Sequence, residues 1–286
     1  MAVSAPYALV ALDLDGTALK SDGTISARLK RAVHEVQERG VHVILATGRM
    51  VQSAARYWEE LALGDGPLVA YQGAVVAMMP AGTVMHEILL PEEGAELAVK
   101  WALAQDLVTQ VYVGRELWVS REDARVRQYI DANHIPAWVR NADALTLWPE
   151  PPIKILLQAE GPLLDRLRPE LEELVRPFPI RVFKSQTDYL ELVHQDVGKA
   201  RGLAIAAGML GVKAEEVFAI GDAENDMDML QWAGFGVAMG QAPEAVKRAA
   251  NAVTFAVDAD GAAIALEQWV LKVTGEQADA PRGATE

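Results

Sequence analysis

Asp13-Leu14-Asp15-Gly16-Thr17 directly follows an apolar run over residues 8–12 in this chain of 286 residues. Such a short apolar run is typical of a strand that is buried on both faces of a parallel sheet. Open α/β sheets bind ligands at the carboxyl ends of their strands, and residues two apart on a strand point the same way. We therefore expect both carboxylates to face a ligand crevice. Gly16 would let the backbone turn there and bring its N–H close to an anion.

A calcium loop of the EF-hand type is one alternative for this stretch, but its spacing does not fit. A loop beginning at Asp13 requires glycine at position 18 and glutamate at position 24, where the chain has Ala18 and Thr24. A plain polar turn stays open as the second alternative. The choice between a turn and a reactive site therefore depends on the rest of the chain.

Strands and helices alternate on both sides of a central segment. Before residue 84 and after residue 190 the pattern predicts strands at 8–12, 41–45, 68–71, 217–220, 236–239 and 253–256, and helices at 26–39, 51–63, 199–210, 227–233, 243–249 and 262–273. This order implies right-handed βαβ units. It predicts an α/β fold with a Rossmann-like, doubly wound parallel sheet.

The segment over residues 84–190 has a different pattern. It predicts strands at 110–113, 117–120 and 153–158, a strand pair over 180–193, and helices at 91–105, 122–133 and 163–175. Paired strands indicate an antiparallel sheet, so we expect an inserted α+β cap domain. The catalytic core would be discontinuous, over residues 1–83 and 191–274, and the polar segment 275–286 would be a flexible tail.

Two further motifs are candidate sites for an anion. Thr47-Gly48-Arg49 follows a predicted strand, where a hydroxyl and a glycine N–H can donate to a phosphoryl oxygen while Arg49 adds charge. Gly198-Lys199 opens a predicted helix, and both the helix N-terminus and the lysine favour an anion. Taken alone, the first motif also fits an ordinary turn and the second a solvated lysine.

A fourth motif, Gly221-Asp222-Ala223-Glu224-Asn225-Asp226, follows another buried apolar strand. Carboxylates with few lysines beside them repel one another unless a cation lies among them. Mg²⁺ is satisfied by a few carboxylates, waters and a substrate phosphate, so it fits this cluster. The structural alternative is an acidic helix cap with Asp222 as the capping residue.

The composition limits the classes of partner and chemistry. The formal net charge is −14, which argues against nucleic acid or an anionic membrane as partner, because both are bound through lysine and arginine. There is no cysteine, which excludes thiol catalysis. No apolar run reaches the length of a membrane span, about 18 residues. We expect a cytoplasmic protein, either a monomer or a small homo-oligomer.

In this order the four motifs resemble those of the haloacid dehalogenase (HAD) superfamily. The large insertion resembles the cap of its Cof-type, class IIB branch, and the stretches Gly236-Val-Ala-Met-Gly240 and Asp260-Gly261 are similar to that branch as well. Two positions depart from the family pattern. The chain has Gln72 and Gln241 where the family usually has asparagine.

The resemblance implies Mg²⁺-dependent hydrolysis of a small phosphate monoester, such as a sugar phosphate, through an aspartyl-phosphate. Asp13 would be the nucleophile and Asp15 the acid and base. The family pattern assigns Mg²⁺ to Asp13, Asp15, Asp222 and Asp226, and the phosphate to Gly16, Thr47, Gly48, Arg49, Lys199 and Asn225. A phosphomutase on the same core, and a non-catalytic phospho-metabolite-binding protein, remain the two alternatives. We expect the cap to select the substrate; Arg115, Arg140 and Lys184 are its candidate contacts.

Overall fold

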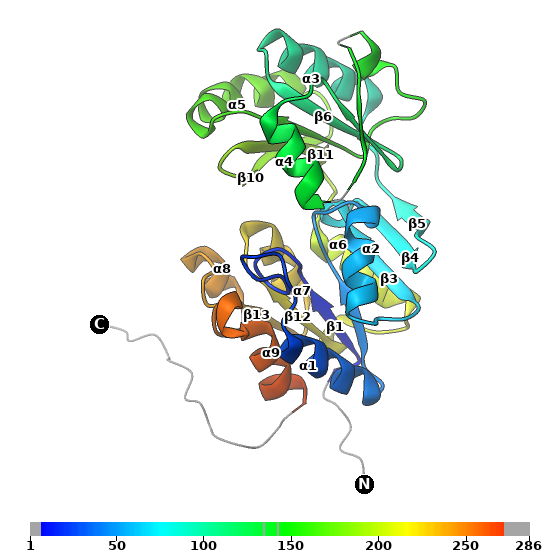
Figure 1. Cartoon of the computed structure of the whole chain (residues 1–286), viewed down its shortest axis with the longest axis vertical. Coiled ribbons are helices and arrows are strands. Elements are labelled where there is room, and N and C mark those ends of the chain that lie inside the picture. Colours follow the sequence, from blue (N-terminus) through cyan, green and yellow to red (C-terminus); the bar gives the residue numbers. More distant parts are fainter. Residues whose placement is uncertain (1–6, 134, 142, 272–286) are drawn as a thin grey trace, which may run out of the picture.

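The structure, a computed structural model, describes residues 7–133, 135–141 and 143–271, so the predicted tail 275–286 lies outside the described residues. Figure 1 shows two lobes, and the chain passes from the lower to the upper lobe and back. The lower lobe contains both ends of the described chain and is called the core lobe here. The upper lobe is the cap.

The core lobe is built on a five-stranded parallel sheet with the order β14-β13-β12-β1-β2. Its strands are β1 (Leu9–Leu12), β2 (His42–Leu45), β12 (Val217–Gly221), β13 (Phe235–Ala238) and β14 (Ala252–Val253). All four residues of β1 are buried, because the strand has a neighbour on each side and helices pack over the sheet. The predicted Rossmann-like, doubly wound parallel sheet is confirmed.

Helices flank this sheet as the apolar periodicity predicts. They are α1 (Ala27–Glu38), α2 (Val51–Glu60), α6 (Lys199–Met209), α7 (Met227–Trp232), α8 (Glu244–Ala249) and α9 (Gly261–Ala265). The hydroxyl of Ser26 accepts a hydrogen bond from the Leu29 N–H at 3.0 Å and caps the start of α1. After α9 the chain continues as a π-helical turn over Leu266–Val270, and the end of the predicted helix 262–273 lies outside the described residues.

A second, antiparallel sheet of three strands lies beside β2. It consists of β3 (Gly66–Ala70), β4 (Val75–Met79) and β5 (Thr83–Glu87), and the bridge between Ala46 and Val69 joins it to the parallel sheet. The sequence analysis predicted only the first of these strands. The turn between β3 and β4 places Tyr71 (φ 50°) and Gln72 (φ 61°) in the left-handed region, which side chains other than glycine rarely adopt. Gly73 (φ 93°) is the residue of this turn whose type signals a turn, and the sequence analysis did not use it.

The cap is an α+β unit with a six-stranded sheet of order β10-β11-β9-β6-β7-β8. Its strands are β6 (Val108–Val113), β7 (Glu116–Val119), β8 (Ala137–Val139), β9 (Lys154–Gln158), β10 (Ile180–Gln186) and β11 (Tyr189–His194), and its helices are α3 (Glu92–Ala104), α4 (Ala124–Asn133) and α5 (Gly161–Val175). All neighbours pair antiparallel except β7 and β8, and β8 was not predicted.

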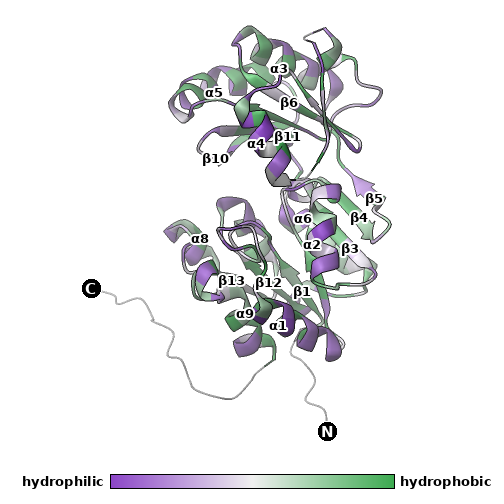
Figure 2. Cartoon of the chain, in the orientation of Figure 1, coloured by the Kyte–Doolittle hydropathy of each residue, from purple (hydrophilic) through white to green (hydrophobic). Residues whose placement is uncertain are grey.

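The two faces of the cap sheet differ. One face packs under α3 and α5, where Ile155, Leu157, Leu190 and Leu192 share a buried apolar cluster with both helices. The other face points toward the core lobe. Figure 2 shows hydrophobic colour along the strands, with hydrophilic stretches on helices such as α2 and α4. The alternate positions of the strands point to this second face, where residues such as Tyr112 and Leu156 share a buried cluster with the core lobe.

The lobes touch where the ring of Tyr71 meets the ring of Tyr112 edge-on, with centroids 6.0 Å apart. The borders expected near residues 84 and 190 fall inside β5 and β11. Because β5 pairs within the core lobe and β11 within the cap sheet, we propose that the chain crosses between the lobes at residues 88–91 and 195–198. No helix among the described residues is long and apolar enough to cross a membrane.

Candidate active site

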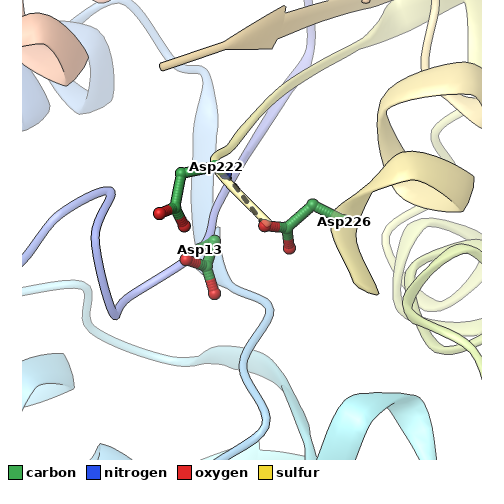
Figure 3. A group of neighbouring side chains, drawn as sticks. All are labelled: Asp13, Asp222 and Asp226. Atoms are coloured by element: carbon green, nitrogen blue, oxygen red, sulfur yellow. Dashed lines mark hydrogen bonds between the residues drawn. The ribbon is translucent and has the colours of Figure 1, made fainter. Parts of the chain in front are cut away.

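Three carboxylates meet at the carboxyl edge of the parallel sheet. Asp13 follows β1 and Asp222 follows β12, and these two strands are neighbours with Leu12 opposite Ile220. Asp226 lies one turn further along the chain. One oxygen from each of the three carboxylates lies within 4.8 Å of the other two, and Figure 3 shows the groups facing one another. Adjacent parallel strands thus bring the first and fourth motifs together, as the sequence predicted.

Lys199 is the cation of this cluster. Its side chain is only 1% exposed, and its Nζ donates to Oδ1 of Asp13 at 2.6 Å and to Oδ1 of Asp226 at 2.5 Å. The other oxygen of Asp226 accepts from the backbone N–H groups of Asp222 and Ala223, both at 2.9 Å. Both oxygens of Asp226 therefore accept short hydrogen bonds, whereas the oxygens of Asp222 have only long contacts of 3.4 Å with the Thr17 hydroxyl and the Gln241 amide.

Burial and mutual repulsion shift the pKa values in this cluster. Burial, followed by the charge of Asp226, raises the pKa of Asp13 well above its ordinary value in spite of Lys199. The same two causes raise the pKa of Asp222 to about 6. Burial alone would lower the pKa of Lys199, but the charges of Asp13 and Asp226 outweigh it and raise that pKa. Three carboxylates against one lysine leave an excess of negative charge, which fits a divalent cation.

Gly16 shapes the loop that faces Asp222. Its φ is +80°, and a Cβ built on it would lie 2.2 Å from Oδ2 of Asp222, so a side chain at this position collides with the carboxylate. Gln241 holds the same loop from the other side. Its Nε2 donates to the Gly16 carbonyl at 2.6 Å, while its Oε1 accepts from the Val257 N–H at 3.0 Å. Gln241, which departs from the family pattern, thus fixes the position of the Gly16 loop.

Asp15 and Arg49 form a bidentate pair at the mouth of the site. The guanidinium donates to the two oxygens of Asp15 at 2.6 and 2.8 Å. It also lies over the ring of Tyr57, 5.2 Å from the centroid. The Asp15 side chain is 57% exposed, so this pair faces solvent rather than the buried cluster. The predicted acid and the predicted phosphate-binding arginine therefore bind each other in this structure.

The second motif and Asn225 meet at Gln72. Asn225 donates its amide to Oε1 of Gln72 at 2.7 Å. Gly48 gives room for the Gln72 amide, because a Cβ on Gly48 would lie 2.4 Å from its Nε2. Thr47 is fully buried behind this loop, and its hydroxyl accepts from the Arg49 N–H at 3.1 Å. Gln72, the other departure from the family pattern, therefore links the Thr47-Gly48-Arg49 motif to the motif that contains Asn225.

A cavity of about 470 Å³ lies between this edge of the core lobe and the cap. From the core lobe it is lined by predicted site residues and their neighbours, namely Asp13, Asp15, Gly48, Arg49, Gln72, Asp222, Ala223, Asn225 and Asp226. Gly16, Thr47 and Lys199 are not among the residues that line it and lie directly behind. The cavity has the size of a small-molecule site.

The cap wall of this cavity was missed by the sequence analysis. It is formed by Gln128, Lys154, Leu156, Ser185, Gln186, Asp188, Tyr189 and Glu191. The candidate contacts Arg115 and Arg140 are not part of it, and Lys184 pairs with Asp165 at 2.6 Å instead. The available signal was the single charged residue within each of two apolar strands, Lys154 in β9 and Glu191 in β11, because a charged residue in an otherwise apolar strand is unusual.

Comparison with known proteins identifies the family. The profile of the haloacid dehalogenase-like hydrolases matches residues 10–266, so the chain belongs to this family and the resemblance in its motifs is confirmed. A relative from Bacillus subtilis (strain 168), 5-amino-6-(5-phospho-D-ribitylamino)uracil phosphatase YitU, is 29% identical over 92% of this chain and 97% of its own. The family of this chain thus includes phosphatases of phosphorylated metabolites.

Solved structures agree on the architecture. A haloacid dehalogenase-like hydrolase from Bacteroides thetaiotaomicron superposes with a TM-score of 0.82 at 34% identity, over 92% of this chain and 99% of its own. A HAD subclass IIB sugar phosphatase superposes with a TM-score of 0.79 over 91% of this chain and 98% of its own. The second protein is only 22% identical, so the likeness concerns the fold alone. The two proteins share the fold over nearly the whole of both chains, so the shared fold includes the cap.

Proposed function

We propose that this protein hydrolyses a small phosphate monoester in a Mg²⁺-dependent reaction, through a phosphorylated Asp13. The observation that carries the proposal is the place of Asp13, at the bottom of the cavity between Asp222 and Lys199. A carboxylate is a competent nucleophile toward phosphorus when a cation offsets its repulsion with the phosphate. The phosphatase relative in Bacillus subtilis supports a sugar phosphate or a similar metabolite as substrate.

The residues that would hold Mg²⁺ are the carboxylates of Asp13 and Asp222, with the backbone carbonyl of Asp15 and with Asp226 in support. The excess of negative charge in the cluster and the raised pKa of Asp222 both support this set. Hydrolases of this family generally use Mg²⁺. Bound there, the ion would neutralise charge on the phosphoryl group and on the carboxylates.

Asp13 and Lys199 form the nucleophilic half of the site. The lysine orients Asp13 through Oδ1, which leaves Oδ2 to attack phosphorus. The bond from phosphorus to the leaving oxygen then breaks, and water later attacks the acyl-phosphate to release phosphate. Lys199 and Asp226 keep the carboxylate in one orientation throughout, which is the main task of a protein in phosphoryl transfer.

Asp15 is the proposed acid and base. It would give a proton to the leaving oxygen in the first step and take one from water in the second. Its pair with Arg49 has to open for either transfer, because both oxygens of Asp15 accept from the guanidinium. An arriving phosphate competes for Arg49, and we propose that this competition frees Asp15. The backbone N–H groups of Gly16 and Gly48, with Thr47 and Asn225, would complete the phosphate site.

The experiment that tests the proposal is release of inorganic phosphate from a panel of phosphate monoesters, with and without Mg²⁺. Turnover that requires both Mg²⁺ and Asp13 supports the proposal. Transfer of phosphate between two positions of a sugar, with no net release, would favour a phosphomutase instead. Tight binding without either reaction would favour the phospho-metabolite-binding protein.

A further inference from the structure

The cap wall of the cavity contains a buried ion pair that the proposed chemistry does not use. Lys154 opens β9 and Glu191 lies in the middle of β11, and their side chains are 3% and 5% exposed. Nζ of Lys154 lies 2.9 Å from Oε2 of Glu191. Both residues line the cavity that also contains Asp13. The pair thus lies at the end of the cavity that belongs to the cap.

The position of the pair argues against a purely structural role. Taking two charges out of water costs several kcal/mol per ion, and well-packed apolar residues often replace such pairs without loss of stability. The opposite face of the same two strands is filled by apolar side chains instead. These are Ile155, Leu157, Leu190 and Leu192, which pack under α3 and α5. In the described part of β9 and β11, the buried pair of Lys154 and Glu191 thus lies on the face that meets the cavity.

The Ser185 hydroxyl lies beside the pair and adds a polar atom that a ligand can bind. Among the described residues its Oγ is buried and has no hydrogen-bond partner, whereas Oε2 of Glu191 already lies 2.9 Å from Nζ of Lys154. Both side chains line the cavity. A buried polar atom without a partner is costly, and a ligand hydroxyl would satisfy it. The site therefore offers hydrogen-bonding atoms to a molecule that enters the cavity.

A network behind the pair fixes its geometry. The Lys154 ammonium lies 4.7 Å from the centroid of the Tyr112 ring, and the Tyr112 hydroxyl donates to Gln110 at 3.2 Å. Gln110 in turn donates to Gln158 at 3.3 Å. All of these residues alternate with the apolar ones, so they lie on the face of the sheet that meets the core lobe. Packing and hydrogen bonds thus hold the pair in place before a ligand arrives.

We propose that Lys154 and Glu191 select the leaving group of the ester and that this group is an uncharged polyhydroxylated alcohol, a sugar or a polyol. This inference rests on the proposed function. Hydroxyl groups both donate and accept, so they match a lysine donor beside a carboxylate acceptor and the Ser185 hydroxyl. A second anionic group on the ester is disfavoured, because the charge of Lys154 is balanced by Glu191 and Asp188 adds another carboxylate to the wall.

The substrate class is tested by measuring kcat/KM for three kinds of ester. These are sugar and polyol monophosphates, esters with a second anionic group such as phosphoglycolate, and p-nitrophenyl phosphate as a small activated reporter. We expect the best polyol ester to exceed the doubly anionic esters at least about tenfold. A preference for the doubly anionic esters would overturn the proposal.

The pair is tested with Glu191→Gln, Lys154→Met and the neutral double variant. In each, we expect the ratio of kcat/KM for the polyol ester to that for p-nitrophenyl phosphate to fall about 10–100-fold, because polar groups left unpaired discriminate strongly. The double variant removes both charges and so avoids a buried unpaired ion if a single variant folds poorly. An unchanged ratio in a folded double variant would contradict the proposal.

A matched control is the pair of Lys100 and Glu96 on α3, which also joins a lysine to a glutamate but is exposed and lies on the helical side of the sheet. Lys100→Met and Glu96→Gln should keep the wild-type ratio. Binding to the Asp13→Asn variant by calorimetry separates this inference from the proposed function. Preferential binding of the polyol ester that Glu191→Gln abolishes supports the pair even if no ester is hydrolysed, and equal binding of all esters overturns it.

Discussion

Two buried lysines in this protein differ in the charge around them. Lys199 in the core lobe bonds to Asp13 and Asp226 and has Asp222 nearby, so carboxylates outnumber it three to one. Lys154 in the cap forms an ion pair with Glu191 and lies over the ring of Tyr112. Both are almost fully buried, and both border the same cavity or lie directly behind it. The excess of negative charge in the core lobe suits a divalent cation and a phosphate, whereas the balanced pair in the cap suits neutral hydroxyls.

This difference assigns separate tasks to the two lobes. Changes in the core cluster should remove the chemistry for every ester. Changes in the cap pair should alter which ester is preferred. The predictions below test that separation, from the largest expected effect to the smallest.

Replacing Asp13 with asparagine should remove the reaction altogether. The substitution keeps the side-chain volume but removes the nucleophile, and losses of a nucleophile amount to roughly 10⁴–10⁶-fold in turnover. Phosphate release from p-nitrophenyl phosphate and from the best metabolite ester should fall together. Glu191→Gln serves as the comparison and should affect the two substrates unequally. Substantial activity of Asp13→Asn on any ester would rule out covalent catalysis at this residue.

Removing divalent metal should abolish turnover for all esters, and Mg²⁺ should restore it. The reason is that Asp13 and Asp222 repel both each other and the phosphate unless a cation lies among them. The measurement is phosphate release after exhaustive chelation and after addition of Mg²⁺. In contrast, chelation should leave binding of a neutral polyol at the cap unchanged. Full activity in the chelated protein would contradict the assigned metal site.

Replacing Lys199 with methionine should destabilise the metal-free protein more than replacing Lys154. Loss of one partner from a buried ion pair costs about 3–5 kcal/mol. Lys199 pairs with both Asp13 and Asp226, and the described ion pair of Lys154 is with Glu191. Mg²⁺ should restore part of the stability of Lys199→Met, because the cation replaces the lost charge, and none of that of Lys154→Met. Chemical denaturation with and without Mg²⁺ measures both effects. If Mg²⁺ restored the same stability to Lys199→Met and Lys154→Met, the surroundings of the two lysines would not differ in their excess of negative charge.

Stabilisation by Mg²⁺ should depend on pH. The pKa of Asp222 is raised to about 6 in the folded protein, so its protonation contributes stability below pH 4 that is lost as the pH rises through 6. Mg²⁺ binds the ionised form, so the increase in melting temperature caused by Mg²⁺ should be larger at pH 7 than at pH 5. Asp222→Asn should remove most of this difference, and Glu191→Gln should leave it intact. If Mg²⁺ raised the melting temperature equally at pH 5 and pH 7, the assignment of Asp222 as a metal ligand would be contradicted.

Local patterns in the sequence were sufficient for the fold and for the core of the candidate site. Short apolar runs marked β1 and β12, and the motifs directly after them had to meet, because the carboxyl ends of parallel strands lie at one edge of a sheet. The contact between Asp13 and Lys199 follows from the same topology, since α6 begins beside that edge. Each motif is local in the sequence, and the topology of the parallel sheet brings together motifs that are far apart in the chain.

Only the tertiary structure decided the rest. The pairs Asp15–Arg49, Asn225–Gln72 and Lys154–Glu191 join residues from different elements, and no local pattern states which side chain reaches which. The sequence analysis also missed the strands β4 and β5. In the turn before β4, Tyr71 and Gln72 adopt a left-handed backbone conformation that is unusual for tyrosine and glutamine. Motif spacing fixes where a strand ends. The partner of a side chain is set by how elements that are distant in the chain pack against one another within each lobe, and local sequence patterns do not contain that information.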